Sequence, residues 1–179
     1  MLQRPLTGEP LALDLVNTRW VDRGGAHDLF DEPGGARVWL AGHRLEPPAG
    51  GGSREVEAAL RTARAALRAV LEQAGAGTED ELNAVLARGV LRRYVRDRSV
   101  GEQVEVEEHW LPAWRAAASY LELLEDHPER IRRCAHPSCV LYFYDTSRNG
   151  TRRWCSMEGC GSRAKASRHY ARSRSQRGS

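Results

Sequence analysis

The sequence predicts an α+β protein in which a mainly helical body with a few antiparallel strands precedes a small cysteine-rich module. Three features predict this organisation. Apolar residues recur at three- and four-residue steps in two long stretches, they alternate with polar residues in shorter ones, and all four cysteines fall within residues 134–160. The first spacing is typical of helices and the second of strands. We therefore expect a body at residues 1–129 and the module at residues 130–179.

The composition is that of a globular protein. A chain of 179 residues, 41% hydrophobic and 28% charged, is long enough for one ordinary domain and a small second one. No apolar run approaches the roughly 18 to 20 residues that cross a bilayer, and the first residues lack the apolar stretch of a signal peptide. We expect a cytoplasmic protein with no membrane partner.

The net charge of +3 conceals a strong asymmetry. Residues 130–179 contain twelve Lys or Arg and two acidic residues, whereas residues 1–129 contain fifteen and twenty-two, so the two parts carry +10 and −7. Basic tails favour nucleic acid because each neutralised phosphate releases condensed counterions. A solvated basic surface is the alternative.

The first ordered stretch is predicted to be a strand over residues 11–18, because Leu11, Leu13 and Leu15 alternate with smaller or polar residues. Polar side chains in and after it form a candidate ligand pocket. The candidates are Asp14, Asn17 and Arg19. We favour the alternative that they form turns and caps, because such side chains commonly satisfy local backbone groups.

Two helices are predicted next. A short one opens at Asp31-Glu32-Pro33, since acids and proline suit a first helical turn. A long one starts after Ser53 as N-cap and turns its arginines to solvent. Its apolar stripe consists of Val56, Leu60, Ala63, Leu67, Val70 and Ala74.

The rest of the body is predicted to contain two further helices and a pair of strands. Thr78 and Glu81 have the spacing of a capping box. Alternation predicts strands at residues 90–98 and 103–110, with a turn at Ser99-Val100-Gly101. The last helix starts at Pro112, and its predicted buried stripe is Trp114, Ala117, Ala118, Leu121 and Leu124. The body contains no P-loop, dinucleotide-binding fingerprint or nucleophile elbow.

The four cysteines form two C-x4-C units separated by fifteen residues, and this pattern predicts a metal site. The ligands are Cys134, Cys139, Cys155 and Cys160. Thiolates bind zinc in tetrahedral sets of four at about 2.3 Å, and disulfides rarely persist in the cytoplasm. We expect one structural zinc ion. A site closed by four cysteines leaves no position for water or substrate, and treble-clef nucleases, the enzymatic alternative, need a histidine base that this module lacks beside its hairpin. We expect no enzymatic activity.

The segment between the cysteine pairs is predicted to be a hairpin. Its strands are residues 140–145 and 152–154, and Asn149-Gly150 is typical of a type I′ turn. A helix follows Cys155 and runs to about Arg174. Knuckle, hairpin and helix follow each other as in a treble clef, with an apolar set predicted from Leu141, Phe143, Trp154 and Met157.

Basic residues of the module are candidates for binding DNA, because the arginine fork donates paired hydrogen bonds to phosphate or guanine. The candidates are Arg148, Arg152, Lys165, Arg168, Arg172 and Arg174. Arg153 and Arg163, nearest to the cysteines, are assigned instead to neutralising the thiolates. RNA or an acidic protein is the alternative partner.

Several stretches together form a long motif that is similar to a known family. In the module these are Cys134-x4-Cys139, Tyr142-Phe143-x-Asp145-x-Ser147-Arg148-Asn149, Arg152-Arg153-Trp154-Cys155-Ser156-Met157 and Cys160-Gly161-Ser162-Arg163-Ala164-Lys165. They closely resemble the CGNR zinc finger. Upstream, Leu13-Asp14-Leu15-Val16-Asn17-Thr18 and Val38-Trp39-Leu40 resemble the ABATE domain that usually precedes this finger. One position departs from the pattern, because Ser162 stands where the family has Asn.

The resemblance implies a putative stress-induced transcription regulator. On it we expect a bacterial, nucleoid-associated protein whose body senses a small-molecule effector or mediates association, and whose finger binds DNA. An RNA-binding or protein-interaction adaptor with a purely structural zinc is the alternative. An enzyme that uses the pocket candidates of the body is a third hypothesis.

Overall fold

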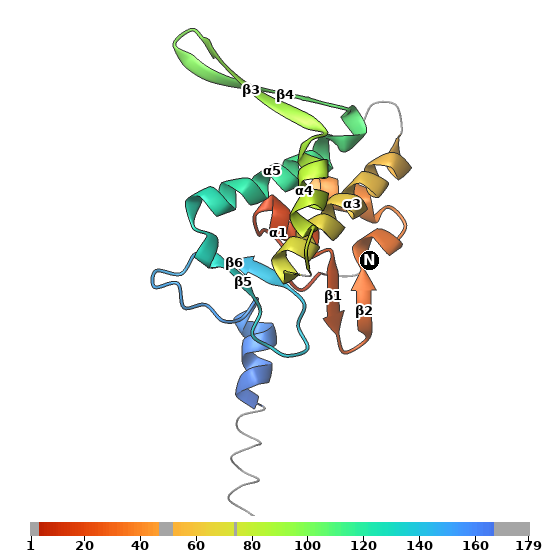
Figure 1. Cartoon of the computed structure of the whole chain (residues 1–179). Coiled ribbons are helices and arrows are strands. Elements are labelled where there is room, and N and C mark those ends of the chain that lie inside the picture. Colours follow the sequence, from red (N-terminus) through yellow and green to blue (C-terminus); the bar gives the residue numbers. More distant parts are fainter. Residues whose placement is uncertain (1–3, 47–51, 74, 167–179) are drawn as a thin grey trace, which may run out of the picture.

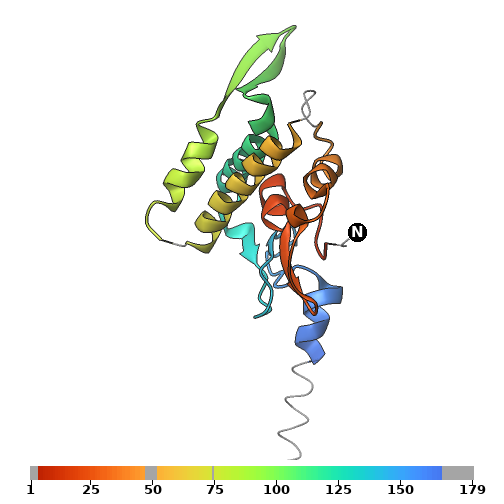
Figure 2. The same cartoon turned by 90° about the vertical axis from the view of Figure 1, so that its right-hand side faces the viewer.

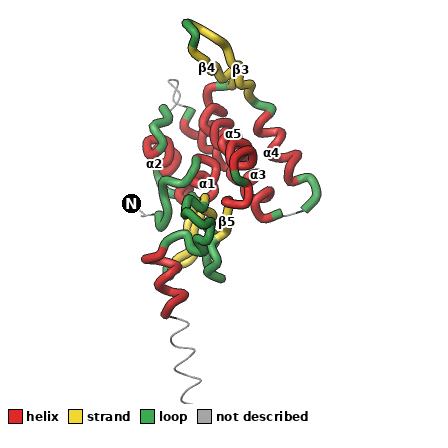
Figure 3. The backbone as a smooth tube through the Cα atoms, turned by 90° about the vertical axis from the view of Figure 1, so that its left-hand side faces the viewer, coloured by secondary structure: helices red, strands yellow, loops and turns green. Residues whose placement is uncertain are grey.

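The computed structural model describes residues 4–46, 52–73 and 75–166. Helices make up the middle of the molecule, and small antiparallel sheets lie around it (Figures 1 and 3). The helices are α1 (Leu11–Val16), α2 (Gly35–Gly42), α3 (Ser53–Glu72), α4 (Thr78–Leu86) and α5 (Leu111–Asp126). Helix α3 packs against α1, α4 and α5 (Figure 2).

Each sheet found in the described residues has two antiparallel strands. The pairs are β1 (Arg19–Asp22) with β2 (Gly25–Asp28), β3 (Gly89–Arg96) with β4 (Ser99–Val106), and β5 (Ile131–Arg133) with β6 (Tyr142–Tyr144). Short helical turns are η1 (Leu29–Asp31), η2 (Glu108–Trp110), η3 (Pro128–Arg130) and the π-helical η4 (Met157–Gly161). The predicted α+β class, with a mainly helical body, is confirmed. None of the helices in the described ranges is long and apolar enough to cross a bilayer.

The predicted strand over residues 11–18 is wrong, because Leu11–Val16 forms helix α1. Every residue from Ala12 to Val16 is fully buried. A short segment that is buried all round has no polar face, so its period is not readable from the sequence. Packing against α3 and α5 decides that it is helical.

Helix α3 is confirmed, and Val56, Leu60 and Leu67 of its predicted stripe are buried. Two details differ. Gly52 holds the N-cap position and makes no side-chain cap, so Ser53 is the first helical residue rather than the cap. The predicted stripe also included Ala74, which lies outside the described residues.

The arginines of α3 do not all face solvent. Arg64 is only 6% exposed, and its guanidinium binds the Asp28 carboxylate at 2.6 and 2.7 Å. Arg68 reaches the Val140 carbonyl at 3.1 Å. The aliphatic parts of both side chains cover apolar surface while their guanidinium groups bind fixed oxygen atoms. Because these oxygens belong to residues distant in the sequence, the apolar pattern of the helix does not reveal them.

The starts of α2 and α4 also differ from prediction. Helix α2 begins after Gly34, which has φ +76°, and a side chain at Gly35 would overlap the Leu29 carbonyl oxygen. Helix α4 begins after Gly77, at φ +84°, and Thr78 donates to the Gly75 carbonyl instead of forming a capping box. Left-handed glycine, which carries no Cβ penalty, replaces side-chain capping at both helices.

The two antiparallel strands predicted after α4 are present, but the second is Ser99–Val106 rather than residues 103–110, and the predicted turn is wrong. Arg96 pairs with Ser99, so the loop is Asp97-Arg98, with φ of 50° and 60°. Positive φ at both residues is the type I′ geometry that matches strand twist. The predicted turn residues lie inside β4 because a two-residue loop without glycine leaves little trace in the sequence.

Helix α5 buries a face that differs from the predicted one. Trp114 and Ala117 are buried as expected, but Leu121 and Leu124 are each 40% exposed. Tyr120 and Leu123 take their place in the core. A helix rich in Ala and Leu offers two adjacent apolar stripes, and the neighbouring elements select one of them.

The predicted hairpin of the cysteine module is wrong. Strand β6 pairs with β5, which lies before the first cysteine, and residues 152–154 form no strand. Asn149-Gly150 lies in a turn closed by Gly150 N–H donating to Ser147 O at 3.1 Å. The returning chain is held by the buried Asp145 carboxylate, which accepts from the backbone amides of Ser147 and Arg152 at 2.9 Å each. A hydrogen bond from the Ser147 side chain, together with these two backbone bonds, holds the pKa of Asp145 below its ordinary value.

Candidate metal centre and its junction with the body

The four cysteines converge into one buried cluster. Their sulfur atoms all lie within 4.8 Å of one another, and each residue is at most 4% exposed. All four thiols are free of disulfides. Four thiols at this separation match the tetrahedral ligand set of a structural zinc site.

Backbone hydrogen bonds bring the two cysteine pairs together. Cys139 N–H donates to His136 O at 2.9 Å, which closes the first turn, and Cys134 N–H donates to Leu141 O at 2.9 Å. Ala135 N–H donates to Arg153 O at 2.9 Å and holds the second pair beside the first. In η4 the Ser156 hydroxyl accepts from Gly159 N–H at 3.2 Å, so the turn presents Cys160 inward. Local turns, rather than a hairpin, position the ligands.

The charges of the sulfurs depend on each other. Sulfur separations are 3.8 Å for Cys139–Cys155 and 3.6 Å for Cys155–Cys160. Hydrogen bonding from Cys139 lowers the pKa of the Cys134 thiol, whereas sharing a proton with Cys134 raises the pKa of both Cys139 and Cys155. Four thiolates cannot coexist here without a cation, because like charges this close oppose ionisation. A dication such as Zn²⁺ supplies the missing charge, so the donor set fits one structural zinc ion.

Groups around the cluster donate to the sulfurs. Cys155 N–H points at the Cys134 sulfur at 3.4 Å, and the Arg163 guanidinium lies 3.0 Å from the Cys160 sulfur. That hydrogen bond raises the pKa of Arg163. The predicted neutralising role fits Arg163, whereas the Arg153 guanidinium stacks over the Trp154 ring at 5.3 Å. Ser162, at the family's Asn position, donates to Met157 O at 3.0 Å and so closes the helical turn that carries Cys160.

Two family models match consecutive parts of the chain. The first, ABATE, described as "Putative stress-induced transcription regulator", matches residues 9–127. The chain belongs to the ABATE family. The second, the CGNR zinc finger, matches residues 130–173 and contains the cysteine cluster. A comparison with curated proteins yields no match. The resemblance seen in the sequence is thereby confirmed, and neither family is described as an enzyme.

The apolar set predicted for the CGNR finger is correct in part. Leu141 and Phe143 are buried, Trp154 is half-buried, and Met157 is 72% exposed. The buried residues belong to the same continuous core as those of the ABATE region. The finger is therefore supported by the body as well as by its metal.

Polar contacts join the ABATE region to the finger. The Asn17 side chain donates to Tyr142 O at 2.8 Å and accepts from Tyr142 N–H at 2.9 Å. Glu9 accepts from Tyr144 N–H at 2.8 Å and pairs with Arg152 at 3.3 Å. Two groups of the body thus complete the open edge of β6 as a neighbouring strand would.

The three candidate pocket residues do not lie in one pocket. Asp14 is fully buried, and Asn17 is bound to Tyr142 as above. Oxygen atoms of Asp14 accept from four groups, which are Arg4 Nη1 at 2.8 Å, Gly8 N at 3.0 Å, Trp39 Nε1 at 3.1 Å and His43 Nε2 at 2.9 Å. Burial alone raises the pKa of Asp14, but the bonds from His43 and Arg4 outweigh it and lower that pKa overall.

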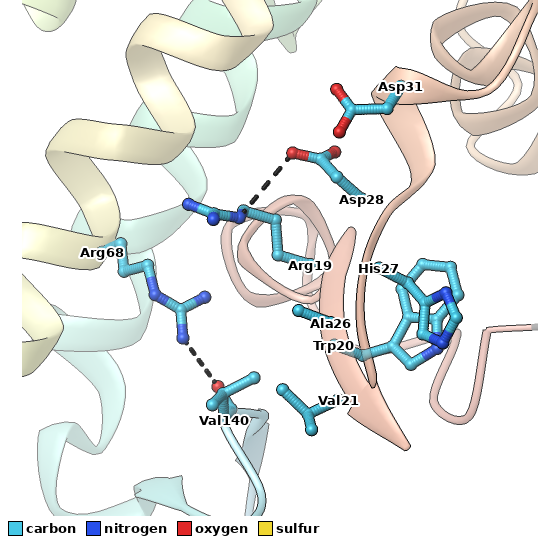
Figure 4. Close-up of a pocket in the computed structure, with 9 residues that line it drawn as sticks. All are labelled: Arg19, Trp20, Val21, Ala26, His27, Asp28, Asp31, Arg68 and Val140. Carbon is cyan, nitrogen blue, oxygen red and sulfur yellow. Dashed lines mark hydrogen bonds and ion pairs between the residues drawn. The ribbon is translucent and has the colours of Figure 1, made fainter. Parts of the chain in front are cut away.

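Arg19 lines a different hollow, between β1, β2, α3 and the finger. Its cavity volume is about 260 Å³. Arg19 projects into the hollow, where its guanidinium lies 3.7 Å from the carboxylate of Asp28, its paired residue on β2, and Arg68 enters from α3 to bind Val140 O (Figure 4). Trp20 and His27 lie on the opposite side of the β1–β2 ribbon, stacked at 5.2 Å (Figure 4).

The candidate DNA-binding residues have different surroundings. The side chains of Arg148 and Lys165 are exposed and make no hydrogen bond or ion pair with other described residues. Arg152 is engaged internally, because it donates to Cys155 O at 2.6 Å and stacks on Phe143 at 4.2 Å. Three further candidates, Arg168, Arg172 and Arg174, lie outside the described residues.

Two exposed arginines of β5 were not among the predicted contacts. Arg132 donates to Gly150 O at 3.2 Å, which places it at the same turn as Arg148, and Arg133 follows it. The signal was present in the run Arg130 to Arg133, which precedes the first cysteine. The structure shows why it matters, since β5 is part of the finger through its pairing with β6.

Proposed function

We propose that the chain is a bacterial transcription regulator that binds DNA through the basic surface of its zinc finger. One observation carries this proposal. Residues 130–166 contain eight basic and two acidic side chains, and Arg152 alone among those eight pairs with a carboxylate within the described structure. The exposed ones are Arg132, Arg133, Arg148, Arg153 and Lys165. A surface of unneutralised cations on a rigid zinc-held scaffold suits the phosphate backbone.

The body differs in this respect. Seven of its fifteen arginines pair with carboxylates of the described residues, as in the buried pair of Arg64 with Asp28 at 2.6 Å and the exposed pair of Arg61 with Asp31 at 2.9 Å. Positive charge is therefore available on the finger, and the acidic body of charge −7 is repelled by phosphate. This polarity supports an orientation in which the finger faces the DNA.

Fluorescence anisotropy with labelled duplex DNA at increasing salt tests the proposal. We expect the logarithm of the binding constant to fall linearly with the logarithm of salt concentration, by a slope of about −0.9 per phosphate contact. The double variant Arg148→Gln/Lys165→Gln should reduce the slope by about 1 to 2. Arg54→Gln removes an equally exposed charge from α3 and should leave the slope unchanged.

Competition decides between DNA and the alternative partners. Unlabelled duplex should displace the labelled DNA at lower concentration than a structured RNA of equal length. Preferential displacement by RNA would make the protein an RNA-binding adaptor. Absent or salt-independent binding by the zinc-loaded protein would contradict nucleic-acid recognition altogether.

A further inference from the structure

The β3–β4 hairpin, residues 89–106, projects from the end of the body opposite to the finger (Figures 1 and 2). We call it the arm. Nine large hydrophobic residues are exposed in the described parts of the chain, and five of them are on the arm, namely Val90, Leu91, Tyr94, Val95 and Val100. Neither outer edge of the arm pairs with another described strand. A two-stranded ribbon is marginally stable by itself, and open apolar edges are normally covered.

One face of the arm carries most of this apolar surface. Residues paired directly across an antiparallel ribbon share a face, and the face alternates along each strand. The pairs Leu91 with Val104, Arg93 with Glu102 and Val95 with Val100 therefore form one surface, which we call the arm face. Three of these residues and part of α5 line a cavity of about 520 Å³. The arm face thus looks across an open wedge toward α5.

We infer that the arm face binds the arm of a second copy of this chain, giving a two-fold symmetric dimer. The charge pattern identifies the occupant. Arg93 and Glu102 lie side by side in the middle of the apolar face, 3.4 Å apart. A two-fold axis along the arm lays β3 of one copy over β4 of the other. Arg93 of each copy then faces Glu102 of the other copy, and Val95 of each copy faces Val100 of the other. An axis across the arm that passes through the Arg93–Glu102 pair would instead lay Arg93 on Arg93 and Glu102 on Glu102, so at this pair the axis along the arm is the one that matches opposite charges.

Nucleic acid does not suit this surface. The arm contains four arginines and three acidic residues, and two of the arginines are already paired, Arg92 with Glu105 at 2.7 Å and Arg93 with Glu102. Burying the valines against an identical surface removes apolar area from water, which is the main driving force of association. The dimer does not rest on the proposed DNA binding, and it leaves the finger of each copy exposed.

Size-exclusion chromatography with light scattering tests the dimer on the full, zinc-loaded chain. We expect the native protein to run at twice the 20.0 kDa mass of the chain and Val95→Asp to run as a monomer. Val38→Asp is the matched control, because Val38 is an exposed valine on α2, outside the arm, and should leave the dimer intact. Zinc content and a cooperative melting transition establish that each variant is folded.

A charge exchange separates contact between arms from folding of the arm. Arg93→Glu and Glu102→Arg each place like charges across the interface, so each variant alone should be monomeric. An equimolar mixture should dimerise, because each negative face then meets a positive one although neither arm has regained its internal pair. A monomeric native chain, a dimer that survives Val95→Asp, or a mixture that stays monomeric would each overturn the proposal.

Discussion

At the junction between body and finger, buried polar groups form hydrogen bonds with each other across the contact. On the arm, by contrast, apolar side chains are exposed to solvent. Asn17 binds both backbone groups of Tyr142 and replaces a missing strand. On the arm, Val95 is 77% exposed and both strand edges are open. The described chain leaves no buried side-chain nitrogen or oxygen unpartnered. The difference indicates that the junction is complete within one chain and that the arm is not.

The largest expected effect is at the metal, which holds the finger side of the junction. Cys155→Ser should abolish stoichiometric zinc binding and unfold the finger, because zinc contributes on the order of 10 kcal/mol to the folding of small fingers. Elemental analysis and thermal melting measure both losses. Ser138→Ala, an exposed change in the same knuckle, is the control. A finger that stays folded without zinc would show that the junction alone suffices.

A smaller effect is expected at the hydrogen bonds of the junction. Asn17→Ala should lower the free energy of unfolding by about 2 to 4 kcal/mol, because it leaves a buried peptide group of Tyr142 without partners. Urea unfolding measures the loss, and the exposed Asn83→Ala in α4 should be nearly neutral. Equal stability of the two variants would mean that water replaces the lost partner.

The buried carboxylate of Asp14, in the body, makes the free energy of unfolding depend on pH. Its pKa is lowered in the folded protein, so its stabilisation is present above the unfolded pKa of about 3.9 and is lost as pH falls through the folded value. Asp14→Asn should cost about 1 to 3 kcal/mol at neutral pH, and the difference from the native protein should shrink below about pH 4. Chemical unfolding at several pH values tests this against the exposed Asp80→Asn. A difference that does not vary with pH would contradict the assigned ionisation.

The smallest effect is expected on the arm. Val95→Thr should change the free energy of unfolding of dilute protein by no more than about 0.5 kcal/mol, since the side chain is exposed and threonine also favours strands. The same exchange at the fully buried Val16, in α1, should cost about 1 to 3 kcal/mol, because it buries a hydroxyl group. Similar losses at both positions would mean that the arm is covered within a single chain.

The candidate site was predictable where the chemistry lies in residue type and spacing. Four cysteines in two C-x4-C units determine the ligand set without reference to the fold. The contacts that fix the finger to the body were not predictable, because Asn17 and Tyr142 are 125 positions apart. The prediction of a hairpin at Asn149-Gly150 was wrong for a related reason, because β6 pairs with β5, which lies upstream in the sequence.

The sequence by itself determined the zinc ligands, the long helix α3, the two strands of the arm and the charge difference between body and finger. Periodicity and ligand chemistry act over short distances along the chain, so they are readable from it. The tertiary structure alone decided that Leu11–Val16 is a helix and that Arg64 and Arg68 point inward. It also decided that the buried Asp14 carboxylate accepts hydrogen bonds from several segments of the body. Each of these depends on partners distant in sequence, whose burial and hydrogen bonds outweigh local preference.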